Sequence, residues 1–189
     1  MKTIASTVLT ALAYATVRYN AFKGVPWDQW PTFVVNKAAA LSALLLVVIF
    51  LLRRRVRVAG GQRLLLATAS WLVALHVGLS LALFTPATYP KLFAEGRPVA
   101  TVAWSLLLAA AAAGTFLRSR HPDGLTDRGW PLRLGLLAFA SGLHAALLGY
   151  EGWFAPSSWP GFLVPITLIA FVAGVIGLWA GARGARDGR

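Results

Sequence analysis

Residues 64–84, LLLATASWLVALHVGLSLALF, decide the fold of this chain. They contain no acidic residue, no lysine and no arginine. An α-helix rises about 1.5 Å per residue, so about 20 apolar residues cross the roughly 30 Å hydrocarbon core of a bilayer. The stretch therefore predicts a transmembrane helix, and a single imidazole, that of His76, lies inside it.

Five apolar blocks along the chain have this length, and a sixth block at the N-terminus is shorter. The sequence of 189 residues is 58% hydrophobic and only 13% charged, which is typical of an integral membrane protein. We therefore predict an all-α polytopic membrane protein, a six-transmembrane-helix bundle that forms one domain over residues 1–189. The expected spans are about 3–19, 33–52, 64–84, 99–117, 132–150 and 162–181.

The first block has an alternative interpretation as a signal peptide. Lys2 precedes an apolar run, and Ala13-Tyr14-Ala15 resembles a cleavage site with small residues. Tyr14 and Tyr19, however, suit an anchor at the membrane interface. We expect the first helix to be retained.

Basic residues divide unequally between the two sides of the predicted bundle. The net charge is +12, but Lys and Arg cluster in the gaps between apolar blocks, which favours membrane topology over nucleic-acid binding. By the positive-inside rule, the side with more basic residues is cytoplasmic, and both termini lie there. That side holds Lys2, Arg53, Arg54, Arg55, Arg57, Arg63, Arg118, Arg120, Arg128, Arg133, Arg183, Arg186 and Arg189, and the other holds Arg18, Lys23, Lys37, Lys91 and Arg97.

The composition also excludes several classes of site. The chain has no cysteine, so disulfides, Cys-ligated zinc, iron–sulfur clusters and covalently attached c-type haem are excluded. The gaps between spans reach only about 14 residues, too few for a soluble nucleotide-binding or flavin domain. No GxGxxG or GxxxxGK[ST] element follows a strand. The function therefore lies within the bilayer or at its faces.

Two histidines, His76 and His144, lie inside the predicted spans and at similar depth. His76 follows Arg63 by 13 residues and His144 follows Arg133 by 11, which places them about 20 Å and 17 Å from the cytoplasmic boundary. Two neutral imidazoles at one height on helices that run in the same direction can ligate a haem iron from both faces. We predict His76 and His144 as cofactor-binding and metal-binding residues, and no catalytic residue.

Small and hydroxyl residues flank the two imidazoles. Ser80 or Ser141, or a backbone carbonyl one turn away, could accept the second imidazole N–H and fix the tautomer. A separate stripe of Gly135, Gly142 and Gly149 predicts close helix packing.

Other interpretations of the histidines stay open. His76 and His144 could be packing residues that bond neighbouring helices, in a cofactor-free scaffold. A proton relay or transporter is a third interpretation, although the spans contain no Asp or Glu. His121, in RSRHPDGLTDRG, lies in a Pro-Asp-Gly turn and is expected to be a solvated loop residue.

Several segments together resemble the ferric-reductase-like transmembrane domain. They are QRLLLATASWLVALHVGLSLALFTPATYP, DRGWPLRLGLLAFASGLHAALLGYEGWFAPSSWPGFLVPITLI and, as in short bacterial members, the N-terminal RYNAFKGVPWDQWPTFVVNKAAALSALLL. The likeness extends over about 18–182. This family includes ferric reductases, NADPH oxidases and the haem-binding membrane subunit of a methionine sulfoxide reductase system. The resemblance implies a six-helix bundle with b-type haem ligated by histidines of the third and fifth spans.

The chain departs from the family in one respect. Family members often have two histidines on each of these helices and hold two haems, whereas here each helix has one. The resemblance therefore implies a single haem b on His76 and His144, in a multi-pass protein of the bacterial inner membrane. We expect an electron-transfer subunit of an oxidoreductase, without a catalytic domain of its own. Its partners would be the bilayer, a separate redox donor or acceptor protein and the other subunits of a larger complex.

Overall fold

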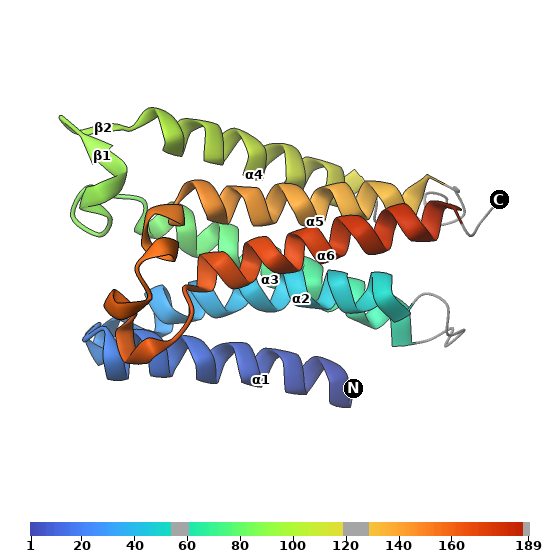
Figure 1. Cartoon of the computed structure of the whole chain (residues 1–189), viewed down its shortest axis with the longest axis horizontal. Coiled ribbons are helices and arrows are strands. Elements are labelled where there is room, and N and C mark those ends of the chain that lie inside the picture. Colours follow the sequence, from blue (N-terminus) through green and yellow to red (C-terminus); the bar gives the residue numbers. More distant parts are fainter. Residues whose placement is uncertain (54–60, 119–128, 187–189) are drawn as a thin grey trace.

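The computed structural model describes residues 1–53, 61–118 and 129–186. Within these ranges the chain is mostly helical, and a helix occupies each of the six apolar blocks (Figure 1). The long helices are α1 (Lys2–Thr16), α2 (Val35–Arg53), α3 (Gly61–Leu83), α4 (Ala100–Arg118), α5 (Trp130–Leu147) and α6 (Ile166–Arg186). The start of α1 and the end of α6 lie at the same end of the molecule (Figure 1).

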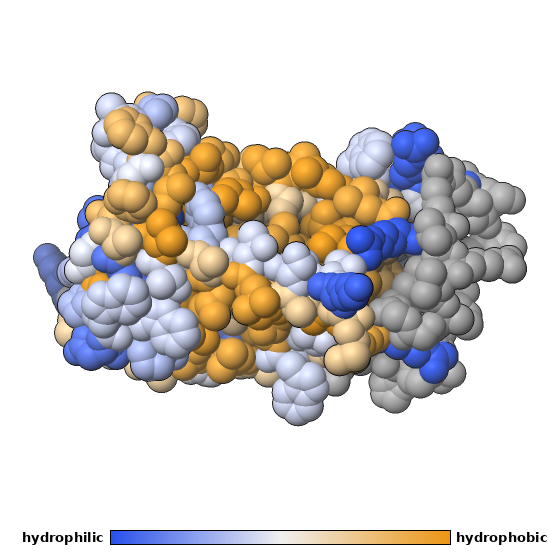
Figure 2. Space-filling view, turned by 90° about the horizontal axis from the view of Figure 1, so that it is seen from below, coloured by the Kyte–Doolittle hydropathy of each residue, from blue (hydrophilic) through white to orange (hydrophobic). Residues whose placement is uncertain are grey.

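Three helical stretches in the described ranges are long and apolar enough to cross a membrane. They are Trp27–Arg53, Arg63–Leu83 and Pro160–Arg186, and Ala100–Gly114 is a shorter apolar helix. Figure 2 shows one face of the molecule, on which an apolar belt lies between two more hydrophilic ends. The predicted helical class is thus confirmed, and these helices indicate membrane association.

Short elements connect the long helices at the end of the bundle opposite the termini. Two are π-helices, η1 (Val17–Phe22) and η3 (Trp30–Val34). An unpredicted hairpin of two two-residue strands turns through Glu95 and Gly96, both with positive φ. The other elements are η2 (Trp27–Gln29), η4 (Pro90–Leu92), β1 (Phe93–Ala94), β2 (Arg97–Pro98), η6 (Tyr150–Phe154), η7 (Pro156–Ser158) and η8 (Pro160–Phe162).

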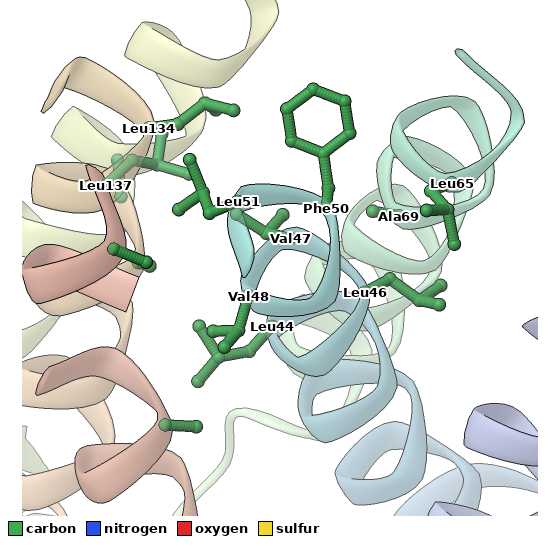
Figure 3. Close-up of a cluster of buried hydrophobic side chains, with 14 of the residues drawn as sticks. Leu44, Leu46, Val47, Val48, Phe50, Leu51, Leu65, Ala69, Leu134 and Leu137 are labelled. Atoms are coloured by element: carbon green, nitrogen blue, oxygen red, sulfur yellow. The ribbon is translucent and has the colours of Figure 1, made fainter. Parts of the chain in front are cut away.

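Helix α2 is the centre of the bundle. It packs against α1, α3, α5 and α6, and most of its residues are buried. In the core cluster of Figure 3, side chains of α2 such as Val47 and Leu51 lie between Leu65 of α3 and Leu134 of α5. The sequence of α2 is hydrophobic on all sides, as expected of a helix that is surrounded by apolar side chains of its neighbours.

Helices α5 and α6 approach each other through glycines, as the stripe at Gly135, Gly142 and Gly149 predicts. A Cβ atom on Gly142 would lie only 2.9 Å from the carbonyl oxygen of Ala170, and one on Gly135 only 2.9 Å from that of Gly177. The predicted close packing is confirmed, with α6 as the partner helix. Small residues permit such contact between backbones.

The end of α1 is tied to the segment that precedes α6. Arg18 is buried and donates a hydrogen bond to the carbonyl of Leu163, and the Tyr14 hydroxyl donates to that of Val164 at 2.5 Å. The indole N–H of Trp30 donates to Thr16 at 2.9 Å. These bonds fix η1 and η3 beside the first turns of α2, which carries part of the candidate site.

Candidate cofactor-binding site

His76 lies about two turns before the end of α3 and points a ring nitrogen at α2. Its Nδ1 is 2.5 Å from Oδ1 of Asn36, a buried residue in the first turn of α2. An amide oxygen only accepts hydrogen bonds, so Nδ1 carries the proton and donates it. Sequence reasoning missed Asn36, because nothing in the sequence shows that its turn of α2 meets His76.

Ser80 completes this polar group. Its Oγ accepts from Nδ2 of Asn36 at 3.1 Å and lies 3.4 Å from Nδ1 of His76. The predicted role of Ser80 beside the imidazole is therefore secondary, because the amide of Asn36 is the nearer acceptor. The side chain of Asn36 is held at both ends and orients the ring.

His144 lies in the last turn of α5 and bonds a neighbouring helix in the same manner. Its Nδ1 is 2.9 Å from the backbone carbonyl oxygen of Ser105 in α4 and 2.6 Å from the hydroxyl of that serine. The serine hydroxyl donates in turn to the carbonyl of His144 at 3.2 Å. Because the carbonyl of Ser105 only accepts, Nδ1 of His144 also carries the proton.

The two histidines thus share one tautomer. Each has its proton on Nδ1, so each leaves a lone pair on Nε2, and within the described residues neither Nε2 has a hydrogen-bond partner. A metal-ligating histidine is usually a neutral imidazole whose single N–H bonds a carbonyl or carboxylate while the other ring nitrogen binds the metal.

A lysine and a tyrosine adjoin the histidines. Lys37 follows Asn36 in α2, and a positive charge on Lys37 acts on both imidazoles, while one on His144 acts on His76. The hydroxyl of Tyr89 is buried, and the described part of the chain gives it no hydrogen-bond partner. Burial raises the pKa of the Tyr89 phenol, and the nearby polar side chain of Asn36 opposes this rise, although it makes no hydrogen bond to the hydroxyl.

Some predictions about the site need correction, and one concerns a residue that the structure does not describe. The Ser141 hydroxyl bonds the carbonyl of Leu137 in its own helix at 2.9 Å, and Ser105 has the role predicted for Ser141. His144 lies nearer the end of its helix than the middle, since α5 ends at Leu147, whereas His76 lies nearer the middle of α3. His121 lies outside the described residues.

The chemistry of the donor set fits a haem better than a bare metal ion. Within residues 1–53, 61–118 and 129–186, no three of His, Cys, Asp and Glu gather at one point. Two imidazoles are few ligands for an isolated ion, but a porphyrin supplies four nitrogens and needs only axial donors.

Comparison with known proteins gives no relative on which to rest the function. No family model matches the chain, and no similar curated protein or solved structure is found.

Proposed function

We propose that this protein is a b-type cytochrome subunit of a membrane complex, in which Nε2 of His76 and Nε2 of His144 ligate one haem. The observation that carries the proposal is the shared tautomer. Two histidines from different helices each donate Nδ1–H to a fixed carbonyl oxygen, at 2.5 Å and 2.9 Å, and present an unprotonated Nε2. The resemblance to the ferric-reductase-like family points to the same pair.

When bound, haem supplies one-electron transfer through its iron. The residues of the chain then have two tasks. Asn36 and the Ser105 carbonyl hold the imidazoles in one orientation and tautomer, and their bonds raise the basicity of the ligand nitrogens. Ligand identity, hydrogen bonding and burial are the means by which a protein sets the haem potential.

The proposal includes the arrangement in the membrane. All six long helices would span the bilayer of the bacterial inner membrane, with both termini cytoplasmic. The start of α1 and the end of α6 lie at one end of the bundle, which supports this, since an even number of crossings returns the chain to its starting side (Figure 1). The basic loops would then receive a separate donor or acceptor protein of a larger oxidoreductase complex.

The decisive experiment is a reduced-minus-oxidised absorption spectrum of the purified protein. We expect the Soret and α bands of a six-coordinate b-type haem, at one haem per chain. His76→Ala and His144→Ala each remove an axial ligand and should abolish this spectrum, while His121→Ala is the matched control and should leave it unchanged. A wild-type spectrum that survives both substitutions would refute the assignment.

A cofactor-free scaffold is the second candidate, and one observation favours it. Each histidine bonds a neighbouring helix, His76 to α2 and His144 to α4, which is also how a purely structural histidine is satisfied. A scaffold would purify as a folded, colourless protein. Its stability would still fall in His76→Ala and His144→Ala, because the carbonyl acceptors would lose their donors.

A further inference from the structure

Two donor groups beside the histidines lack an acceptor. The ammonium of Lys37 lies over the rings of Phe33 and Tyr89, with 5.2 Å and 4.9 Å between Nζ and the ring centroids. In the described ranges Lys37 makes no ion pair, and the acidic residues Asp28, Glu95 and Glu151 are all exposed. The buried Tyr89 hydroxyl has no hydrogen-bond partner there either.

Leaving these donors unpaired is unfavourable. Lys37 is only partly buried, but an ammonium partly removed from water without a counter-ion, like a buried hydroxyl without an acceptor, costs free energy. Aromatic rings offset part of the cost for Lys37 through cation–π attraction, but they accept no hydrogen bond from it. A carboxylate is the group that would satisfy both, because its two oxygens accept from an ammonium and a hydroxyl at once.

The surrounding charge also favours an anion. Lys37 experiences the charge of Lys23, and Lys23 that of Arg18 and Lys91. Burial, with repulsion from Arg18 and then Lys91, lowers the pKa of Lys23. The region therefore combines several cations with no described carboxylate inside it.

We infer that Lys37 and Tyr89 bind a carboxylate of the ligand that His76 and His144 hold, which for haem is a propionate. This inference rests on the proposed function. From the sequence, Lys37 is only one of the basic residues near a membrane surface. The inference gives it a specific role in ligand binding. The same pair of donors would not recognise a porphyrin whose carboxylates are esterified.

The test compares binding of two porphyrins to purified protein produced without haem. Iron protoporphyrin IX and its dimethyl ester are titrated into the wild type, and absorbance reports binding. We expect iron protoporphyrin IX to bind the wild type about tenfold more tightly than its dimethyl ester, because only the free carboxylate forms a charge-assisted hydrogen bond with Lys37. Lys37→Met should remove this preference, Lys37→Arg should keep most of it, and Tyr89→Phe should reduce it.

Lys2→Met is the matched control, because Lys2 is exposed, lies at the start of α1 and is not among the cations that act on Lys37 or Lys23. It should keep the full preference. Lys37→Gln provides a second neutral variant if Lys37→Met does not fold. A preference that persists in Lys37→Met or Lys37→Gln would overturn the inference, as would a wild type that binds both porphyrins equally. Failure of the wild type to bind either porphyrin would instead refute the proposed function, and the inference with it.

Discussion

Substitution of Gly142 by alanine should destabilise the bundle, although alanine is the better helix former. A Cβ atom at Gly142 would lie 2.9 Å from the carbonyl oxygen of Ala170 and 3.1 Å from Cα of Phe171. Carbon atoms pack best at about 3.5–4.0 Å, so the two backbones must separate by a few tenths of an ångström. Both obstructing atoms belong to the backbone of α6 and cannot rotate away.

The magnitude follows from two opposing contributions. Gly→Ala in a helix interior stabilises by about 1 kcal/mol, whereas forcing an extra methyl group into a packed contact costs about 1–3 kcal/mol. Gly78 of α3 is the matched control, because a Cβ there would meet no atom within 4 Å. We expect Gly78→Ala to be neutral or stabilising and Gly142→Ala to be less stable than it by about 1–3 kcal/mol.

The assay is denaturant-induced unfolding of both variants in one mild detergent, followed by circular dichroism. The haem content of each preparation is measured as well, because loss of a ligand would lower apparent stability by mass action. If Gly142→Ala unfolded at the same denaturant concentration as Gly78→Ala, the close approach of α5 and α6 would not be an energetic constraint, and the packing argument would be wrong.

Three further predictions concern the polar residues of the site. Asn36→Leu removes the acceptor for His76 and should lower haem affinity by about 10–100-fold, measured by absorbance titration; an unchanged affinity would exclude a role in orienting the ring. Ser105→Ala should have a much smaller effect, because the backbone carbonyl at 2.9 Å from His144 remains, and an equally large loss would contradict that assignment. Burial raises the pKa of Tyr89 above 10.0, so its contribution to stability is full below pH 10.0 and is lost as the pH rises through the folded-state pKa. Tyr89→Phe should therefore unfold with a weaker alkaline dependence in detergent, and an unaltered dependence would refute this.

The helices were predictable because a bilayer imposes a simple rule of length and hydropathy. The expected block 64–84 ends within one residue of the end of α3 but begins three residues after its start, and 99–117 contains nearly all of α4. The ends of the helices are harder to predict where proline and glycine occur in the connecting segments. Helix α6 begins at Ile166 and not at 162, because Pro160, Gly161 and Pro165 interrupt regular hydrogen bonding before it.

The hairpin at Phe93–Pro98 escaped prediction for a different reason. It has only two residues in each strand, too few for an alternating pattern, and Glu95 adopts a positive φ that its type rarely takes. The turn dipeptide Glu95-Gly96 is a weaker signal than Asn-Gly or Asp-Gly. Short turns in connecting loops are thus hard to predict, even where the helices on each side follow clear rules.

For the site, the depth of each histidine could be predicted from the sequence, but the side chains that contact it could not. Depth along a helix can be counted from the sequence, so His76 and His144 could be paired by their rise from Arg63 and Arg133. The rotation of one helix against another cannot be counted, since it depends on how side chains of several helices fill the core together.

Asn36 and Ser105 illustrate the consequence. Each is an ordinary polar residue of an apolar helix, and only the assembled bundle places it against an imidazole. The choice between a haem ligand and a packing histidine turns on Nε2, because both readings require the same bonded Nδ1. Every neutral imidazole that donates through Nδ1 leaves Nε2 unprotonated, so the two interpretations differ only in whether Nε2 binds a metal. The unpaired donors of Lys37 and Tyr89 lie beside the two imidazoles. A ligand that carries both a metal ion and a carboxylate would therefore bind the two histidines through the metal and Lys37 and Tyr89 through the carboxylate.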